Sequence, residues 1–150
     1  MGPRRLSPLI WNPQVAVGDF HEKFGLPRAT YPDLGTRGER QMRANLIHEE
    51  CLELLEALQD EDDLAHIARE MADVLYVIYG SAVTFGIDME PVFEEVHRAN
   101  MAKVGGAIDG RGKLGKPPSW QPPDVESIIR EQVLGDSRHG AGYNEAGVRE

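Results

Sequence analysis

The chain is poor in features that would place it outside the cytoplasm. Its 150 residues include a single cysteine, Cys51, so no disulfide can form within the chain, which fits a reducing compartment. Positions 1–30 lack the continuous apolar stretch of a signal peptide. No run approaches the roughly 20 apolar residues that a membrane span needs. From these absences we expect a cytoplasmic protein that does not enter a membrane.

Basic residues are scarce as well. Lys and Arg number 16 against 25 Asp and Glu, which gives a formal net charge of -9 and a pI of about 5.0. This balance argues against a surface that binds nucleic acid polymers. A small anionic substrate stays compatible with it, because a bound metal ion reverses the local charge. The glycine pairs of Gly105–Gly112 are not followed by Gly-Lys-Ser/Thr, so no phosphate-binding loop signature is present.

The pattern of apolar residues and helix breakers predicts an all-α fold. We expect helices over residues 13–25, 38–59, 63–85, 90–103 and 123–133. They would form one helical domain over residues 13–134, after an irregular lead at 1–12 and before a flexible tail at 135–150. Between Ala72 and Ala82 the third helix is apolar on nearly every side, which favours a central position with one face against another subunit.

Two pairs of acids are spaced three residues apart, Glu50 with Glu53 and Glu70 with Asp73, and each pair therefore shares one helix face. The acidic run 60–63 between them indicates a turn. The cross pairs Glu53–Glu70 and Glu50–Asp73 are both centred between residues 61 and 62, so an antiparallel hairpin would bring all four carboxylates together. Converging carboxylates repel one another unless protons or cations neutralise them. The simplest such cation is a hard divalent metal such as Mg²⁺.

Other interpretations compete with a metal site. Acids on helices usually form a solvated face, although Glu50 lies in the middle of an apolar stripe, where an unpartnered carboxylate is costly. Ion pairs with Arg43, Arg69 or Arg98 would neutralise the acids without a metal. A di-iron site needs two Glu-x-x-His motifs, and Glu94–His97 is the single clear one.

Polar and basic residues downstream suit a phosphate. Asn100 and Lys103 share one face of the fourth helix, and Lys113, Lys116 and Trp120 follow in a Gly/Lys/Pro-rich loop. Lone lysines are usually solvated. A metal site built from four acids, however, often serves phosphates, which need cations on their outer side. A flexible loop carrying lysines could close over such a ligand.

The order of these motifs resembles the all-α nucleoside triphosphate pyrophosphohydrolases. Within them the chain is similar to the MazG-like and phosphoribosyl-ATP pyrophosphohydrolase-like single-domain proteins, including the MazG-like dUTP diphosphatases. The motifs are Glu49-Glu50-x-x-Glu53, Glu70-x-x-Asp73 and His97-Arg98-Ala99-Asn100-Met101-Ala102-Lys103. The likeness covers roughly residues 14–125, with Phe20–Pro27 and Lys116–Asp124 also similar.

The resemblance implies a four-helix-bundle-type, MazG-like fold whose core is completed by homodimerisation, sometimes as a dimer of dimers. It implies hydrolysis of a (deoxy)nucleoside triphosphate, dUTP or another pyrimidine nucleotide first, to the monophosphate and pyrophosphate, with Mg²⁺ or Mn²⁺. By position, the metal ligands would be Glu50, Glu53, Glu70 and Asp73. Glu49 would be the catalytic residue that orients or deprotonates water. The expected substrate contacts are Asn100, Lys103, Lys113, Lys116, Trp120 and Phe20.

Two differences between this chain and other members of the family narrow the range of functions that we expect. The long lead and tail argue against a histidine-pathway role, and the single acidic set argues against a tandem two-domain regulator. Phe20, Trp120 and Tyr76 are each candidates to stack on the base and are equally explained as core residues. A non-catalytic helical dimerisation or nucleotide-sensing module is the alternative function.

Overall fold

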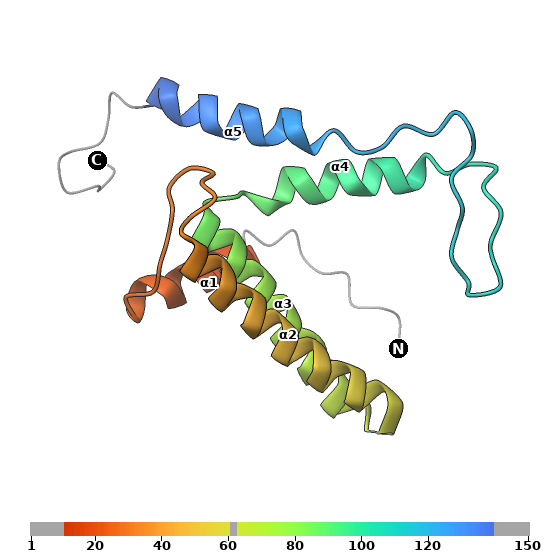
Figure 1. Ribbon diagram of the computed structural model, residues 1–150, viewed down its shortest axis with the longest axis horizontal. Helices are drawn as coiled ribbons and strands as arrows, with labels where there is room; N and C mark the ends of the chain where they lie inside the picture. The colour runs from red at the N-terminus through yellow and green to blue at the C-terminus, as the bar shows by residue number, and fades with distance from the viewer. Residues whose placement is uncertain (1–10, 61–62, 140–150) are drawn as a thin grey trace. The chain divides into compact units, whose positions relative to one another are not determined.

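The computed structural model describes residues 11–60 and 63–139 (Figure 1). They form the helices α1 (Pro13–Lys23), α2 (Arg37–Asp60), α3 (Leu64–Phe85), α4 (Met89–Met101) and α5 (Val125–His139). In these two ranges there is no strand, only an isolated β-bridge between Ile108 and Leu114. The all-α fold class is therefore confirmed. The chain divides into two compact units, one up to Ile87 and one from Asp88 on, and each is described by itself.

Side-chain caps set the starts of three helices. Oδ1 of Asn12 accepts from the backbone N–H of Gln14 at 2.8 Å, ahead of Pro13 in the first turn of α1. Asp63 and Asp88 accept in the same way at the starts of α3 and α4. Gly86 ends α3 in the left-handed region at φ 64°. The bounds of α1 to α4 consequently lie within two residues of those expected from the sequence.

The last helix is longer than expected. α5 runs to His139 instead of ending near Val133. Asp124 precedes its first turn and accepts from the backbone N–H and the hydroxyl of Ser127. Gly135 did not stop the helix, since one glycine in a helix interior costs only about 1 kcal/mol relative to alanine. The first five residues of the expected flexible tail are therefore helical. The rest of that tail, like positions 1–10 of the expected lead, lies outside the described residues.

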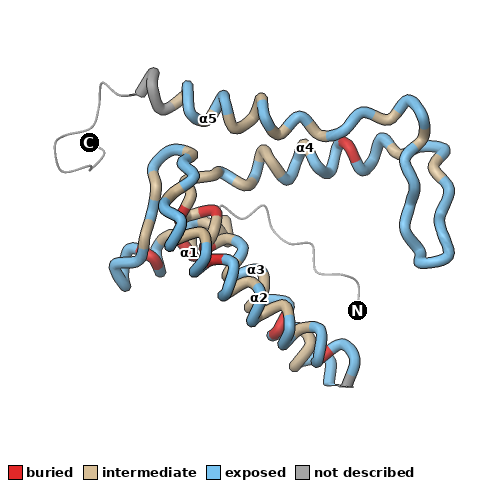
Figure 2. The backbone as a smooth tube through the Cα atoms, viewed as in Figure 1, coloured by how far each residue is buried: buried red, intermediate tan, exposed pale blue. Residues whose placement is uncertain are grey.

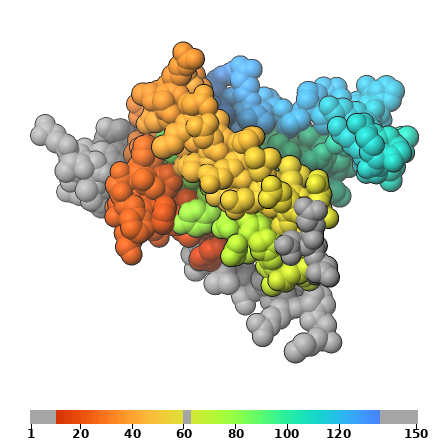
Figure 3. Space-filling view, turned by 60° about the horizontal axis from the view of Figure 1, so that its bottom comes forward, coloured from red at the N-terminus to blue at the C-terminus, as the bar shows by residue number. Residues whose placement is uncertain are grey.

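In the first unit, α2 and α3 run antiparallel and side by side, and α1 packs on α3 (Figure 1). In the space-filling view, the visible atoms of α3 lie directly against those of α2 (Figure 3). Arg43 of α2 reaches α3, where Nη2 donates to the carbonyl of Val77 at 2.7 Å and Nε donates to Oγ of Ser81 at 3.0 Å. A Cβ on Gly80 would lie 2.5 Å from Nη2 of Arg43, so glycine permits this approach. Arg43 and Gly80 are centred on the point predicted from the acid pairs, between residues 61 and 62.

Buried positions of the first unit lie both where α1 meets the α2–α3 pair and near the end of that pair remote from α1 (Figure 2). Among the described residues of this unit, the buried ones are Val17, His21, Arg43, Ala57, Glu70, Gly80, Ala82 and Thr84. Several large apolar side chains of α2 and α3 stay more than a third exposed, namely Leu52, Leu55, Leu58, Met71, Leu75 and Ile78. An apolar surface of this kind is typical of a helix pair that packs against a further partner.

The loop between α1 and α2 crosses the C-terminal end of α3. The backbone N–H of Ala29 donates to the carbonyl of Val83 at 3.1 Å, and that of Asp33 donates to the carbonyl of Phe85 at 3.0 Å. Between these two bonds, the backbone of Tyr31 lies directly against Gly86. The left-handed turn at Gly86 is thus enclosed by another segment of backbone.

In the second unit, α4 packs against α5. At the start of α4, the backbone N–H of Asp88 donates to Oε1 of Gln132, and Nε2 of Gln132 donates to the carbonyl of Asp88, both at 3.0 Å. Further along α4, Glu95 accepts two hydrogen bonds of 2.7 Å from Arg98 and one of 2.9 Å from the backbone N–H of Asp124. These bonds join α4 to the middle of α5 and to Asp124, the residue before its first turn.

The Glu95 bonds give this unit an acid-sensitive contact. The pKa of Glu95 is lowered to about 2, first by the side chain of Arg98 and then by the N–H of Asp124. Because the folded-state pKa lies below the unfolded value, the stability that this carboxylate contributes is present above the ordinary glutamate pKa of 4.5 and is lost as the pH falls towards 2. We expect Glu95→Gln to lower the unfolding temperature near neutral pH, and its difference from wild type to vanish at about pH 2.

Thermal unfolding followed by circular dichroism at both pH values measures this difference. Glu94→Gln is the matched control, because Glu94 is the adjacent, exposed glutamate of the same helix. It should behave as wild type throughout. A difference between Glu95→Gln and wild type that persists undiminished in acid would contradict the assignment.

Candidate metal centre

Three carboxylates of the first unit converge. Glu50 and Glu53 of α2 and Glu70 of α3 each offer one oxygen, and these oxygens lie within 4.8 Å of one another. Hard divalent cations take oxygen ligands at roughly 2.0–2.6 Å, which spaces the ligand oxygens by about 3–5 Å. The antiparallel pairing of α2 and α3 therefore builds a group of oxygens whose spacing suits one such ion.

Glu70 is the enclosed member of this group, being 1% exposed. Its Oε1 accepts from Nε and Nη2 of Arg69 at 3.2 and 2.8 Å and lies 3.7 Å from Nδ1 of His66. Its Oε2 is buried and has no hydrogen-bond partner among the described residues. Leaving a buried polar atom unsatisfied costs about 1–3 kcal/mol, and more for a charged group. A cation would supply the missing partner, so this donor set fits Mg²⁺ or Mn²⁺.

The raised pKa of Glu50 also favours a bound cation at this group. Burial raises the pKa of Glu50 above its usual value, and further increases come from the charges of Glu53, Asp73, Glu49 and Glu70. A raised pKa means that the folded chain takes up a proton on Glu50 more readily than the unfolded chain does. Without a metal, the fold thus loses stability as the pH rises through this pKa and regains it as the pH falls. A divalent cation would relieve the same repulsion without a proton.

The other two expected acids lie beside this group. Asp73, expected as a fourth ligand, is half-buried on α3 and is not among the three residues whose oxygens approach within 4.8 Å. Its negative charge still raises the pKa of Glu50. Glu49 is exposed, next to Glu50 on α2, and its charge acts on Glu50 in the same direction. The structure therefore brings three of the four predicted ligands into one group, with the fourth close enough to act on it.

Burial within the group differs from the sequence-based expectation. The helical pattern of α2 placed Glu50 at the centre of the buried seam, yet Glu50 is half-buried, Glu53 is exposed and Glu70 is fully enclosed. Glu70 lies against α2, where Glu50 and Glu53 approach it, and its Oε1 is covered by Arg69 and His66 of its own helix. Apolar periodicity within one helix carries no information about how many neighbours cover it.

Of the three arginines considered as ion-pair competitors, Arg69 alone pairs with a predicted ligand. Arg98 pairs with Glu95, and Arg43 has no carboxylate within ion-pair distance in the described part of the chain. The Arg69 side chain is 69% exposed, so its pair with Glu70 is largely screened by solvent. We expect Arg69→Gln to tighten Mn²⁺ binding about two- to fivefold, because a competing cation is removed.

Calorimetric titration of Mn²⁺ into the purified variant measures this change. Arg37→Gln, an exposed arginine at the start of α2, is the control and should leave the affinity unchanged. Weaker Mn²⁺ binding in Arg69→Gln would instead show that Arg69 assists in holding Glu70 for the metal.

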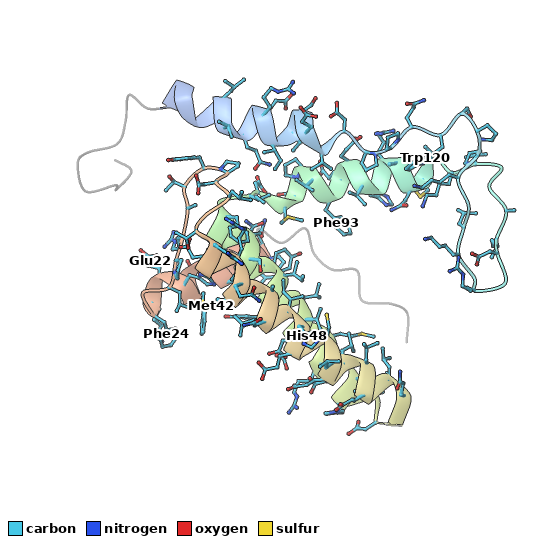
Figure 4. All side chains as sticks on the ribbon, viewed as in Figure 1. Glu22, Phe24, Met42, His48, Phe93 and Trp120 are labelled. Carbon is cyan, nitrogen blue, oxygen red and sulfur yellow. The ribbon has the colours of Figure 1, made fainter. Side chains whose placement is uncertain are left out.

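The expected substrate-contacting residues of the second unit lie around the C-terminal end of α4. Asn100 is exposed, and Lys103 is half-buried with Nζ 5.8 Å from the ring centroid of Trp120. Nζ of Lys116 lies 4.5 Å from the same ring. Trp120 lies beside α4, where its Nε1 donates to the carbonyl of Ala99 at 2.6 Å (Figure 4). The structure therefore brings Lys103, Lys116 and Trp120 together within this unit.

Phe20 belongs to an aromatic group of the first unit. Its ring meets Tyr76 edge-on, with centroids 5.5 Å apart, and lies 4.7 Å from Phe24. Tyr76 is three residues after Asp73 on α3, and it lines an apolar cavity of about 320 Å³ together with Trp11 and Tyr79. Two of the three aromatic residues proposed for stacking on a base are thus neighbours, one helical turn from a predicted metal ligand.

No single helix among the described residues has the length and hydropathy of a membrane span. In the described part of the chain, one helix pair, α3 with α4, meets these criteria when the two helices are counted together.

Comparison with known proteins identifies a family that this chain matches. A family model described as phosphoribosyl-ATP pyrophosphohydrolase matches residues 17–100, more than half of the chain. The matched range contains all five predicted acids and Asn100, and it ends before Lys103. The uncharacterized protein L479 of Acanthamoeba polyphaga mimivirus is 37% identical over 79 residues, which are 50% of this chain and 31% of that protein. The chain thus matches about a third of the length of this curated relative.

The all-helical fold, the paired acidic motifs on α2 and α3 and the extent of the family match agree. The chain belongs to the phosphoribosyl-ATP pyrophosphohydrolase family, within the MazG-like all-α nucleotide pyrophosphohydrolases.

Proposed function

We propose that this protein is a divalent-metal-dependent nucleotide pyrophosphohydrolase that cleaves a nucleoside triphosphate between its α- and β-phosphates. The observation that carries the proposal is the buried, unpartnered Oε2 of Glu70 within a group of three carboxylates. Family membership supports the reaction class, and the carboxylate group supports the dependence on a metal. Monophosphate and pyrophosphate would be the products.

Glu50, Glu53 and Glu70 would hold Mg²⁺ or Mn²⁺, with Asp73 as a further ligand. A bound divalent ion offsets the charge of a triphosphate and lowers the pKa of a coordinated water. Glu49 is exposed beside this group on α2, so its carboxylate is open to a water that approaches from solvent. In this proposal Glu49 orients that water and accepts its proton.

The proposed substrate is a pyrimidine deoxynucleotide, dUTP first, by resemblance to the MazG-like dUTP diphosphatases. The edge-on pair of Phe20 and Tyr76 offers an apolar, aromatic surface that suits a base, one helical turn from Asp73. Asn100 and Lys103 are proposed contacts for the phosphates or the sugar.

A homodimer, or a dimer of dimers, is part of the proposal. The exposed apolar side chains of α2 and α3 support it, because a helix that is apolar on nearly every side needs cover on nearly every side. Light scattering on the purified chain tests the assembly state. We place the enzyme in the cytoplasm, where nucleoside triphosphates are abundant.

Turnover on a panel of natural and damaged nucleoside triphosphates with Mg²⁺ tests the function. We expect pyrophosphate and the monophosphate in equal amounts, and no products in the presence of EDTA. Release of orthophosphate would contradict cleavage between the α- and β-phosphates. A panel that yields no product would favour the alternative, a helical dimerisation or nucleotide-sensing module that binds without turnover.

Glu49→Gln separates the proposed base from the proposed ligands. We expect Mn²⁺ affinity close to wild type, with turnover lower by about 10²–10⁴-fold because general base catalysis is lost. Single-turnover kinetics and Mn²⁺ titration measure the two effects. Glu56→Gln, another exposed glutamate of α2, should change neither. Loss of Mn²⁺ binding in Glu49→Gln would place Glu49 among the ligands.

A further inference from the structure

Arg43 supplies the directional bonds between α2 and α3. Among the described residues of these two helices, no other side chain and no backbone group forms a hydrogen bond or an ion pair from one helix to the other. The buried apolar residues that the structure describes on the two helices are small, Ala57 and Ala82. Because apolar packing is non-directional, these contacts set the axial register of α2 against α3 only weakly.

The position that the guanidinium of Arg43 occupies on α3 is closely matched to it. Nη2 donates to the carbonyl of Val77 at 2.7 Å, and Nε donates to Oγ of Ser81 at 3.0 Å. Oγ of Ser81 in turn donates to the same Val77 carbonyl at 2.9 Å. Gly80 leaves the necessary space, since a Cβ there would lie 2.5 Å from Nη2. Two bonds from one rigid fork to neighbouring groups of α3 fix where along α3 the arginine lies.

Packing alone does not explain an arginine at this position. Arg43 is 6% exposed and has no carboxylate within ion-pair distance in the part of the chain that the structure describes. A buried charge without a counter-charge is costly, and burial lowers the pKa of Arg43. An apolar side chain of similar length would fill the same space without that cost.

The Arg43 contact has the same register as the carboxylate group. Arg43 lies seven residues before Glu50 on α2, and Val77 lies seven residues after Glu70 on α3, so the two contacts are two helical turns apart on the same faces. Sliding α2 by one residue would move the oxygens of Glu50 and Glu53 by about 1.5 Å relative to Glu70. Metal–oxygen distances tolerate only about 0.2 Å. Metal binding at this group therefore needs the register to be fixed.

We propose that Arg43 is a positioning residue of the metal centre, whose two bonds to α3 hold α2 in the register at which Glu50, Glu53 and Glu70 can share one divalent cation. It acts through the placement of the two helices and not by contact with the metal or the nucleotide. The inference rests on the proposed function only in that the carboxylate group binds a divalent metal. It is independent of the nucleotide and of the reaction.

Arg43→Met tests the proposal by calorimetric titration of the full chain with Mn²⁺. The bond from Ser81 to the Val77 carbonyl remains, so the change leaves neither group unpaired. We expect unchanged helix content by circular dichroism and Mn²⁺ binding weaker by about 10–100-fold, the range found for residues that orient metal ligands. Incomplete folding lowers the apparent affinity only in proportion to the folded fraction, which circular dichroism measures.

Gly80→Ala is a second variant, which keeps the charge of Arg43. Its Cβ would take the place of Nη2 and also lie 3.2 Å from Nε2 of His21. The flexible end of Arg43 then has to leave the Val77 carbonyl. We expect a loss of Mn²⁺ affinity here too, which separates helix register from any electrostatic effect of the arginine on the acids. Because both variants act through one contact, Arg43→Met/Gly80→Ala should bind Mn²⁺ no more weakly than Arg43→Met alone.

Arg40→Met is the matched control. Arg40 lies three residues earlier on α2, and its Nη1 donates to the carbonyls of Leu34 and Gly35 in the preceding loop. The substitution thus also removes two bonds to oxygen acceptors but leaves the contact between α2 and α3 intact. It should bind Mn²⁺ as wild type does. Equal losses in Arg40→Met and Arg43→Met, or wild-type affinity in Arg43→Met or Gly80→Ala, would overturn the proposal.

Nucleotide turnover, measured on the same samples, separates this proposal from the proposed function. A wild-type chain that hydrolyses nucleotides, with an Arg43→Met variant that binds Mn²⁺ equally well, would overturn the role of Arg43 alone. A wild-type chain that binds Mn²⁺, loses that binding in Arg43→Met and hydrolyses no nucleotide would overturn the proposed function alone. A wild-type chain that takes up no Mn²⁺ would overturn both.

Discussion

Glu70→Gln should abolish nucleotide hydrolysis while leaving the fold intact. Glutamine has nearly the same shape and can keep one oxygen as an acceptor for Arg69, but it removes the negative charge that a divalent cation needs. Metal ions contribute several kcal/mol of transition-state stabilisation, so we expect turnover to fall by about a thousandfold or more. In the absence of metal, removing the charge of Glu70 relieves like-charge repulsion within the carboxylate group, and the lost pair with the exposed Arg69 contributes little. The metal-free variant should therefore unfold at the same temperature as wild type or a higher one.

Two measurements check this result, namely turnover with Mg²⁺ and thermal unfolding with and without Mn²⁺. Binding to the native state alone raises the unfolding temperature by mass action, so Mn²⁺ should stabilise wild type and leave Glu70→Gln unchanged. Glu56→Gln, an exposed glutamate of α2 outside the carboxylate group, should respond to Mn²⁺ as wild type does. Near-wild-type turnover in Glu70→Gln, or a persistent response to Mn²⁺, would remove Glu70 from the metal site.

Gly86→Ala should produce the largest loss of stability. Its φ of 64° lies in the left-handed region, where a side chain costs about 1–2 kcal/mol. A Cβ there would also fall on the backbone carbonyl of Tyr31, which is tied to α3 by the bonds of Ala29 and Asp33 on either side. Overpacking of this kind costs a further 1–3 kcal/mol or so. We expect a total loss of about 2–5 kcal/mol in the free energy of unfolding.

Gly25→Ala is the matched control for this prediction. Gly25 has the same φ of 64°, but nothing lies within 4 Å of the position its Cβ would take. It should therefore lose only the strain term, about 1–2 kcal/mol. Chemical denaturation of both variants measures the difference. If both variants lost the same free energy of unfolding, the loop over the end of α3 would have moved away from the new Cβ with no loss of stability.

Local chemistry explains why the helices could be located from the sequence. Asp63 and Asp88 cap with side-chain oxygens a few bonds from the backbone that they serve, and Gly86 tolerates the left-handed turn that ends α3. The point between residues 61 and 62 followed from counting residues across one short turn. For this reason the pairing of Glu53 with Glu70 was predictable, and the group of Glu50, Glu53 and Glu70 forms where expected.

Other features of the site depend on neighbours that are distant in the chain. The same limit applies to helix ends: Gly135, a residue type that often stops helices, lies inside α5. The position of Asp73 outside the close group depends on side-chain directions that helical spacing alone does not give. Arg43 was one of the three arginines considered as ion-pair partners of the acids, yet it donates to the carbonyl of Val77 and the hydroxyl of Ser81 on α3.

The sequence by itself determined the bounds of α1 to α4 to within two residues, the antiparallel register of α2 and α3 and the family, because these depend on residue spacing and on bonds between near neighbours. Only the tertiary structure decided that Glu70 is the enclosed member of the carboxylate group, with one oxygen paired and the other without a hydrogen-bond partner among the described residues. It also decided that Lys103 and Lys116 share the ring of Trp120. Burial and charge balance are sums over every neighbour in space, and a one-dimensional pattern specifies few of those neighbours.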